Sequence, residues 1–401
     1  MSGPLDGTLV LDLSRVLAGP WASQTLADLG ARVIKVERPG RGDDTRSWGP
    51  PFLSSGDDRE SAYFLSANRG KESIAIDFKD KRGQAVVTEL ARKADILIEN
   101  YKPGGLEAYA LDYASISRIN PAIVYCSISG FGQSGPYSKK PGYDFMIQAA
   151  SGLMSVTGTE KPTKVGVAVS DLITGLYAAT GILAALTRAR ETRQGEWVDI
   201  SLLDAQLAAL ANQAMNFLVT AESPGLAGNA HPNIVPYQVF ESADEPFVVA
   251  VGNDGQFVSL CDSIGQRELA LDSRFSSNDA RVRNRQVLVP LIADVLKQQP
   301  AAHWLGIFDD AGIPAAPVNT IGEAFADPHV VERQTVMHMT RAGLGPVPGV
   351  RSPVRLHHCV ADEVRAPPAL GDSTVAVLRE IGLGDDDIKS LLIEGVAASS
   401  K

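Results

Sequence analysis

Short apolar runs alternate with helical segments in the first third of the chain, and this alternation constrains the fold most strongly. The runs are rich in β-branched residues and lie at 8–13, 32–37, 73–78, 95–100 and 122–129. Segments with helical spacing lie between them at 20–30 and 80–94. Strands that alternate with helices predict an α/β fold with a parallel sheet and helical crossovers. Because ligands of such sheets bind beyond the carboxyl ends of the strands, the residues after each run are the first candidates for a site.

The middle of the chain predicts two long helices, at 171–189 and 202–219, joined by a short strand at 196–201. The first of these helices is apolar on nearly every face, which predicts that it is deeply buried. A linker rich in Pro, Gly and Asn follows at 222–236 and separates the preceding part of the chain from a smaller region.

That smaller region, 237–325, begins with a hairpin-like pattern and continues as helices. The stretch 343–355 contains several Gly and Pro residues and predicts a second linker. Two helices, at 373–382 and 385–393, are expected near the end of the chain.

Composition excludes several classes of protein. The chain has 401 residues and a formal net charge of −10, which argues against a nucleic-acid partner but not against a small anion held by local cations. Its 3 cysteines give neither a disulfide framework nor zinc-ligand spacing, so we expect no metal and a reducing, cytoplasmic setting. The start of the chain does not resemble a signal peptide, and the apolar runs near 171–186 and 205–219 are too short or too polar to span a bilayer. We therefore expect no membrane partner.

Basic residues gather near the ends of the predicted strands. They include Arg38, Lys71, Lys102 and Lys140. A single surface cation is usually only solvated, but a group of them at strand ends suits a ligand that carries phosphate. Trp48 and Tyr101 would each supply a flat face for a base in such a ligand, or would belong to the core.

Two glycine-rich motifs have a structural interpretation beside a functional one. G-F-G-Q-S-G at 130–135 matches a dinucleotide fingerprint, but Pro136 and Pro141 interrupt the helix that such a site requires. We therefore expect no nicotinamide or flavin, and we assign these glycines to a loop close to a ligand or to another backbone segment. V-G-N-D-G-Q-F at 251–257 is either a turn or a mobile flap over a site.

Asp171 is the acid at the start of the apolar segment 171–186. An Asp before an apolar helical run is typical of a helix N-cap. The helix N-terminus would also favour an ionised carboxylate, and an ionised, partly desolvated carboxylate can attack an acyl group. The residues alone leave both roles open.

Several long motifs, in one order, resemble CoA-transferase family III, the group of the formyl-CoA and carnitine CoA-transferases. The motifs lie at 4–46, 94–107, 127–144, 170–186, 231–240, 251–257 and 312–320. The resemblance implies a Rossmann-like large domain that begins in 1–220 and is completed by 331–401, with a smaller α+β domain at 226–330. It also implies that two chains interlock as rings in a homodimer.

The resemblance further implies the chemistry. Asp171 stands where the family has its nucleophile, which would form an aspartyl-acyl anhydride and then an aspartyl-CoA thioester. No cofactor beyond coenzyme A as co-substrate is implied. The implied contacts to coenzyme A are Val16, Leu17, Arg38, Lys71, Asn100, Tyr101, Lys102 and Lys140. The implied flap, which would close over Asp171 and keep water from the anhydride, consists of Gly252, Asn253, Asp254, Gly255 and Gln256.

The sequence departs from the family's pattern at three positions. Leu17 and Ala108 stand where some members carry Gln and Arg, and Ser373 stands where many carry His. Two alternatives to CoA transfer remain. One is an α-methylacyl-CoA racemase of the same fold, although Tyr143 replaces the His of such racemases and is a poor base at neutral pH. The other is a non-catalytic acyl-CoA binder.

The stretch G-D-D-T-R-S-W-G-P-P-F at 42–52 resembles the dicarboxylate branch of the family, the succinyl-CoA:glutarate-like transferases. A distal carboxylate on the acyl group requires a cation, and Arg46 or Arg15 would supply it. Trp48 and Tyr143 are expected in the same substrate region. The predicted partners are therefore an acyl-CoA and a free carboxylic acid.

Overall fold

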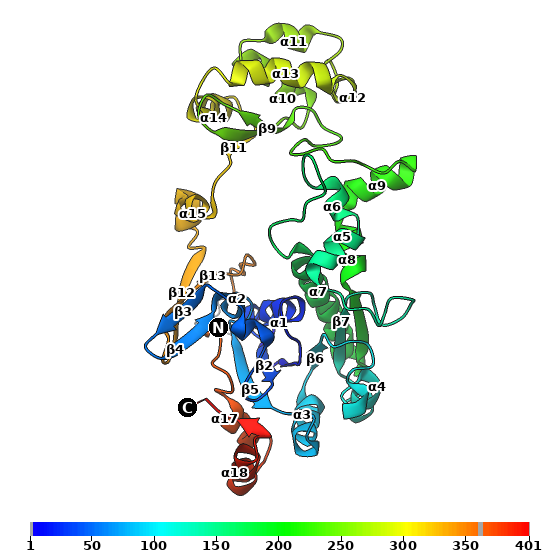
Figure 1. The fold of residues 1–401 in the computed structure, drawn as a ribbon, viewed down its shortest axis with the longest axis vertical. Helices are drawn as coiled ribbons and strands as arrows, with labels where there is room; N and C mark the ends of the chain where they lie inside the picture. The colour runs from blue at the N-terminus through cyan, green and yellow to red at the C-terminus, as the bar shows by residue number, and fades with distance from the viewer. Residues whose placement is uncertain (1–2, 360–363, 401) are drawn as a thin grey trace. The chain divides into compact units, whose positions relative to one another are not determined.

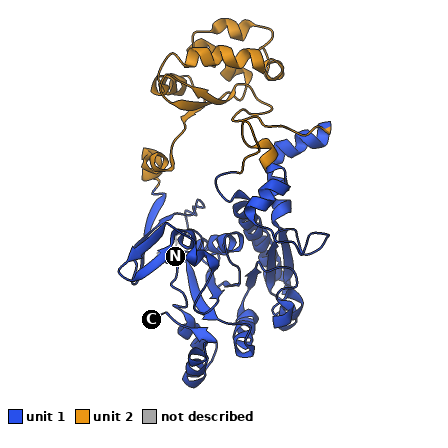
Figure 2. Ribbon diagram, viewed as in Figure 1, with its two compact units in different colours: residues 1–153, 165–220, 334–401 blue, residues 154–164, 221–333 orange. Residues whose placement is uncertain are grey.

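The computed structural model describes residues 3–359 and 364–400, which form two compact units (Figure 2). Unit 1 combines three stretches of the chain, 1–153, 165–220 and 334–401. Unit 2 combines 154–164 with 221–333. The C-terminal stretch therefore belongs to the same unit as the N-terminus.

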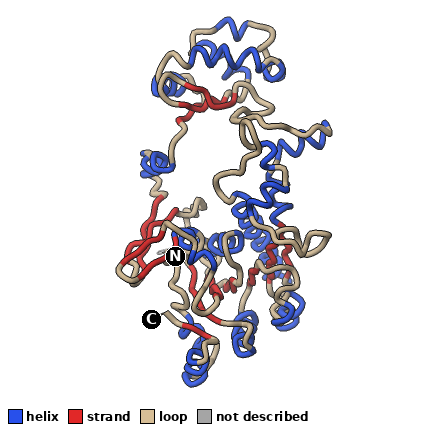
Figure 3. Tube along the Cα trace, viewed as in Figure 1, coloured by secondary structure: helices blue, strands red, loops and turns tan. Residues whose placement is uncertain are grey.

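Unit 1 is built on a sheet for which the described residues supply seven strands (Figures 1 and 3). In spatial order these are β14 (Ala397–Ala398), β5 (Lys71–Ile76), β2 (Arg32–Glu37), β1 (Leu9–Asp12), β6 (Ile96–Glu99), β7 (Val124–Ser129) and β8 (Glu196–Ser201). All neighbours are parallel except β14, which runs antiparallel to β5. The predicted α/β fold with a large parallel sheet is confirmed.

The order of the strands reverses at β1. From β1 the chain adds β2 and β5 on one side, and then β6, β7 and β8 on the other. Connections from β1 and β6 therefore leave the sheet in opposite directions, which opens a crevice between them at the carboxyl edge. This crevice is where a ligand of a doubly wound sheet is expected.

Helices cover both faces of the sheet because neighbouring residues of each buried strand point to opposite sides. Val10 and Ile96 pack in one core with α1 (Ala18–Asp28), α5 (Asp144–Ala150), α7 (Val169–Thr192) and α8 (Leu202–Ala209). Leu11 and Leu97 pack in the other core with α3 (Lys81–Lys93), α4 (Tyr113–Ile119), α17 (Thr374–Glu380) and α18 (Asp385–Ile393). The C-terminal helices thus complete one layer of unit 1.

Helix α7 is buried along one side only, so the predicted deep burial is wrong. Ala178 and Ile182 are buried against the sheet, whereas Leu176 is 50% exposed and Tyr177 is 47% exposed. The helix is long and apolar enough to cross a membrane by length and composition, but a helix of a protein core passes the same test. Its packing against α1, β7 and β8 is that of a core helix.

Two further predictions about unit 1 are corrected. The expected helix at 202–219 is broken into α8 and α9 (Ala211–Thr220), because Ala211 has a positive φ of 45°. The expected linker at 343–355 contains a strand, β13 (Gly345–Val350), which pairs antiparallel with β12 (Val336–Arg341). A second small hairpin was not predicted, and it is formed by β3 (Phe52–Ser55) and β4 (Asp58–Ser61). The shorter helices of this region are η1 (Asp44–Ser47), α2 (Ala62–Ser66) and η2 (Glu107–Tyr109), and α6 (Leu153–Val156) lies where the two units divide.

Unit 2 has a small antiparallel sheet and a helical layer, as the smaller region of the sequence predicts. The sheet runs β11 (Ala315–Pro317), β10 (Pro246–Ala250) and β9 (Tyr237–Glu241). The helices are α10 (Asp254–Ser263), α11 (Arg267–Leu271), α12 (Asn278–Arg283), α13 (Arg285–Leu296), α14 (Ala301–Asp310), α15 (Ile321–Ala326) and α16 (Pro328–Glu332). Phe247, Phe257 and Phe308 are central to its core.

Candidate active site

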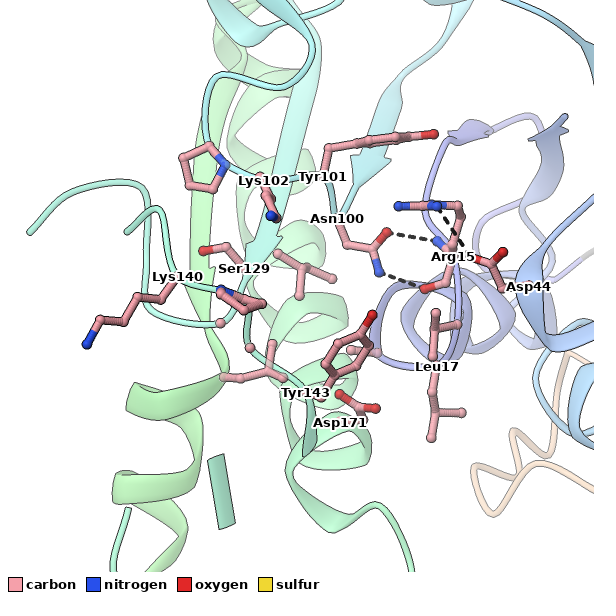
Figure 4. A pocket seen from close by; sticks show the side chains of 18 residues that line it. Arg15, Leu17, Asp44, Asn100, Tyr101, Lys102, Ser129, Lys140, Tyr143 and Asp171 are labelled. Carbon is pink, nitrogen blue, oxygen red and sulfur yellow. Dashed lines mark hydrogen bonds and ion pairs between the residues drawn. The ribbon is translucent and has the colours of Figure 1, made fainter. Parts of the chain in front are cut away.

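A cavity of about 200 Å³ lies in unit 1 where the loops after β1, β6 and β7 meet the start of α7 (Figure 4). The structure brings several of the predicted site residues together here. Those that line the cavity are Val16, Leu17, Asn100, Tyr101, Lys102, Lys140, Tyr143 and Asp171, together with Arg15. Strand order, rather than sequence distance, brings these residues together.

The loop after β1 is held in a strained conformation. Val16 has a positive φ of 70°, which is costly for a β-branched residue and requires support from its surroundings. The side chain of Asn100 clamps the backbone of Arg15: its Oδ1 accepts from the amide N–H at 2.8 Å, and its Nδ2 donates to the carbonyl oxygen at 2.6 Å. The Val16 N–H donates to the carboxylate of Asp43 at 3.3 Å. Asn100 therefore shapes the cavity by positioning this loop.

Lys71 does not line the cavity, although a contact to coenzyme A was predicted for it. It is 1% exposed, and its Nζ donates to Asn68 Oδ1 at 2.9 Å and to the carbonyl oxygen of Pro20 at 3.0 Å. It also lies 3.2 Å from Asp12 Oδ2. Burial lowers the pKa of Lys71 to about 8, against the opposing effect of Asp12. The ammonium group is therefore held in the core beneath the loop, away from the cavity.

Arg38 lies in a second cavity, of about 290 Å³, which shares Arg15 and Tyr101 with the first. The guanidinium carbon of Arg15 lies 4.9 Å from the centroid of the Tyr101 ring, and that ring packs edge-on against Phe78 at 5.9 Å. Lys79 also lines the second cavity. Cations beside aromatic faces suit a ligand that carries both phosphate and a base.

Arg46 and Trp48 do not line the first cavity. The guanidinium of Arg46 bonds both carboxylate oxygens of Glu37, at 2.7 and 2.8 Å, and its Nη1 lies 2.6 Å from Glu60 Oε2. Its Cζ also lies 3.6 Å from the centroid of the Phe64 ring. Arg46 is therefore not available to bind the distal carboxylate of an acyl group, because its guanidinium donors already bond Glu37 and Glu60. Trp48 packs edge-to-face on another aromatic ring, that of Tyr63, at 5.1 Å.

Asp171 lies in the first turn of α7 and is not its N-cap, which is Ala168. The start of the helix is held instead by Asp144, whose Oδ1 accepts from the Ser170 N–H at 2.8 Å. Burial raises the pKa of Asp171 to about 7, and the negative charge of Asp144 adds to this effect. The expectation that the helix N-terminus keeps Asp171 ionised is therefore wrong, because burial and the charge of Asp144 both favour the neutral carboxyl group. The carboxyl group is poised to titrate near neutral pH.

Tyr143 and Lys140 line the same cavity in different ways. In Figure 4 the Tyr143 ring lies beside Asp171, whereas the Lys140 ammonium points away from the other labelled side chains. That ammonium lies 3.6 Å from the centroid of the Tyr137 ring. Lys102 reaches the cavity from the loop after β6.

The glycines of G-F-G-Q-S-G form a loop and not the start of a helix, as predicted. The backbones of Gly130 and Gly142 pack closely, because a Cβ on Gly130 would lie only 2.6 Å from the Cα of Gly142. Both line the cavity with Asp171. This close approach of two backbone segments fixes the wall formed by the loop.

The predicted flap lies in unit 2 and begins α10. Asn253 is the N-cap of that helix, and its Oδ1 accepts from the Gln256 N–H at 2.9 Å. The Gly252 N–H donates to Gln256 Oε1 at 2.8 Å. Gly255 follows inside the first turn, and the carboxylate of Asp254 lies 2.8 Å from Arg281 Nη2. The segment is an ordered helix start, and closure over Asp171 stays a prediction.

Three side chains near the site were not singled out from the sequence. Asp144 begins α5 after P-G-Y, and an acid before an apolar run was a usable signal for it. Ser129 ends β7 and lines the cavity, but a serine in an apolar strand gives no such signal. Burial raises the pKa of Tyr63 to about 12, with a contribution from the charge of Asp171. Among the residues that the structure describes, no three His, Cys, Asp or Glu side chains are grouped as metal ligands.

The doubly wound sheet thus places the partly buried carboxyl group of Asp171 in the wall of a cavity at its carboxyl edge. The sequence model of CoA-transferase family III matches residues 5–374, and the chain belongs to that family. It is therefore a CoA-transferase.

The chain is 46% identical to the succinate–glutarate CoA-transferase of Agrobacterium fabrum, over 94% of this chain and 96% of that protein. It is 43% identical to the human succinyl-CoA:glutarate CoA-transferase, over 98% of this chain and 90% of that protein. The crystal structure of a CAIB/BAIF family protein from Brucella suis superposes with a TM-score of 0.82 at 45% identity. That alignment covers 95% of this chain and 100% of the Brucella suis chain.

Proposed function

We propose that this enzyme moves coenzyme A from a short dicarboxylyl-CoA, with succinyl-CoA as the first candidate, to an acceptor carboxylic acid through covalent intermediates on Asp171. The observation that carries the proposal is a partly buried carboxyl group, with a pKa raised to about 7, in the wall of the cavity at the strand-order reversal. A carboxylate with a raised pKa is more nucleophilic, and part of it is still ionised at neutral pH.

The reaction requires no net proton transfer. An oxygen of Asp171 attacks the thioester carbonyl carbon of the donor, the C–S bond breaks, and the coenzyme A thiolate leaves with its electron pair. The thiolate then attacks the Asp171 carboxyl carbon of the resulting anhydride and displaces the donor acid as a carboxylate. The acceptor carboxylate then attacks the carbonyl carbon of the Asp171 thioester and displaces the coenzyme A thiolate, which gives a second anhydride. The thiolate attacks the acceptor's carbonyl carbon in that anhydride and forms the new acyl-CoA. Asp171 is regenerated as a carboxylate.

The second cavity is the proposed site for the nucleotide end of coenzyme A. Arg38 and Lys79 supply cations for phosphate, and Tyr101 links this cavity to the one that contains Asp171. Val16, Leu17 and Lys102 would contact the remainder of the coenzyme along the first cavity. Lys140 has its ammonium on the Tyr137 ring and would contact the ligand only after leaving that ring.

A dicarboxylate preference is the finer part of the proposal. The relatives from Agrobacterium fabrum and human are named for succinate or succinyl-CoA and glutarate. Of Arg46 and Arg15, the two cations considered for the distal carboxylate, Arg15 lines the first cavity. Its Nε–H is buried without a hydrogen-bond partner in the described structure. A guanidinium with a free donor suits a carboxylate. Arg15→Gln should therefore raise the KM of succinate or glutarate more than that of acetate.

A homodimer is also proposed. Unit 1 exposes large apolar side chains on α7 and α9, among them Leu176, Tyr177, Phe217 and Leu218, which are 45–69% exposed. Large apolar side chains left exposed are candidates for a protein–protein interface. A second chain would cover them, and the interlocked-ring arrangement stays a prediction. The scarcity of cysteine supports a cytoplasmic location as part of the same proposal.

The test is a transfer assay with succinyl-CoA and a set of free acids that includes glutarate, oxalate and acetate. Formation of the new acyl-CoA without net hydrolysis supports the proposal. Absence of transfer to every acid tested would refute it, and faster transfer to monocarboxylates than to dicarboxylates would refute the dicarboxylate preference. Light scattering of the purified protein tests the dimer separately.

A further inference from the structure

Ser129 is a buried hydroxyl group without a partner in the wall of the Asp171 cavity. It is the last residue of β7, it is 8% exposed, and its Oγ has no hydrogen-bond partner in the described structure. Leaving a buried hydroxyl unsatisfied costs free energy, so such groups usually bond to something. The cavity in front of Ser129 is the place from which a partner would come.

The residue that faces Ser129 on the neighbouring strand β8 does not hydrogen-bond its hydroxyl group. Its register partner on β8 is Ser201, whose hydroxyl oxygen already accepts from the Asp204 N–H at 3.2 Å. Two residues earlier on β7, Ser127 has a partner, since its Oγ accepts from Trp197 Nε1–H at 3.0 Å. The two serines share a strand and a face, but the one at the cavity is left without a bond.

We propose that the Ser129 hydroxyl is a substrate-binding group that hydrogen-bonds an amide of the pantetheine arm of the acyl-CoA. The inference rests on the proposed function. In the view of Figure 4, Ser129 lies at a height between Asp171, where the thioester would react, and Tyr101, which leads to the second cavity. The arm that joins the thioester to the nucleotide carries two amides and would run between these ends. A serine hydroxyl both donates and accepts, so it can bond either side of an amide.

The test compares Ser129→Ala with a matched control, Ser127→Ala, in the transfer assay. Ser129→Ala should raise the KM of the acyl-CoA about 5- to 10-fold, the size of one lost hydrogen bond. It should leave kcat and the KM of the free acid within about twofold, because the arm is held equally in the ground and transition states. In the absence of ligand, Ser129→Ala should unfold at the same or a higher temperature than the wild type. Ser127→Ala should show the opposite pattern, with a lower unfolding temperature and an unchanged KM.

Truncated substrates identify the atom that is bound. The penalty of Ser129→Ala should persist with succinyl-pantetheine, which retains both amides, and should vanish with the succinyl thioester of ethanethiol, which has none. A penalty that persists on the ethanethiol thioester, or that appears in the KM of the free acid, overturns the assignment to the arm. An acyl-CoA KM within twofold of the wild type overturns the inference altogether. Wild-type protein that transfers no coenzyme A at all would instead refute the proposed function.

Discussion

Replacing Asp171 with Asn should stabilise the folded protein while it abolishes the reaction. Burial raises the pKa of Asp171 from 3.8 to about 7, so ionising this carboxyl group is harder in the folded than in the unfolded chain. Below pH 3.8 both states are protonated and nothing is lost. As the pH rises towards 7 the unfolded chain ionises first, and the folded state loses stability. Asn carries no such cost.

The size of the effect follows from the same pKa. Each pH unit between the two pKa values corresponds to about 1.4 kcal/mol, so the full cost above pH 7 is at most about 4 kcal/mol. At pH 5 it is about 1.6 kcal/mol. The Asp171→Asn variant should therefore exceed the wild type in free energy of unfolding by a margin that grows with pH and levels off near pH 7.

Urea unfolding of the two proteins at pH 5 and pH 8 measures this margin. Asp204→Asn is the matched control, because Asp204 lies in the first turn of another helix of unit 1 but is exposed. Its margin should stay below about 1 kcal/mol at both pH values. If Asp171→Asn is no more stable at pH 8 than at pH 5 relative to the wild type, the carboxyl group is not held against its ionisation and the reasoning is refuted.

Three further results are expected. The kcat/KM of the wild type should rise with pH through a midpoint near 7, because the nucleophile must be ionised. Asp144→Asn should move that midpoint to lower pH, because it removes a neighbouring negative charge. A midpoint that does not respond to Asp144→Asn would exclude the charge of Asp144 as a cause of the raised pKa of Asp171. Arg46→Ala should destabilise the fold by about 3–5 kcal/mol in chemical unfolding, because it leaves Glu37 buried without its cation. The ratio of dicarboxylate to monocarboxylate rates in the folded variant should not change. An altered ratio would show that Arg46 contributes to the substrate site. Gly130→Ala should lower kcat/KM at least tenfold, because its Cβ would meet the backbone of Gly142; wild-type kinetics would show that the loop wall does not matter.

The sequence was sufficient to predict the parallel strands. Those other than β8 are compact apolar runs that are largely buried, whereas β8 is mostly exposed and was expected from its place between two helices. Strand β13 was not predicted, since its sequence G-P-V-P-G-V reads as a linker and forms a strand through pairing with β12. The burial of α7 was overestimated because composition does not show which face packs on the sheet. Tertiary context decided these elements, and local propensity does not contain it.

The candidate site was predictable where a residue type carries its own chemistry, as with Asp171. Pairing partners were not predictable: Lys71 and Arg46 looked like ligand cations, but Asp12, Glu37 and Glu60 bind them in the core. These contacts join residues far apart in the chain and appear only when the sheet assembles. The rise in the pKa of Asp171 has the same origin, because burial around the start of α7 is a property of the fold.

Mass spectrometry of the protein after reaction with succinyl-CoA in the absence of an acceptor tests the central claim most directly. The peptide that contains Asp171 should carry coenzyme A as a thioester, glutarate should discharge it, and Asp171→Asn should carry none. Transfer to glutarate by the Asp171→Asn variant at the wild-type rate, or a coenzyme A adduct on another residue that glutarate discharges, would contradict the account.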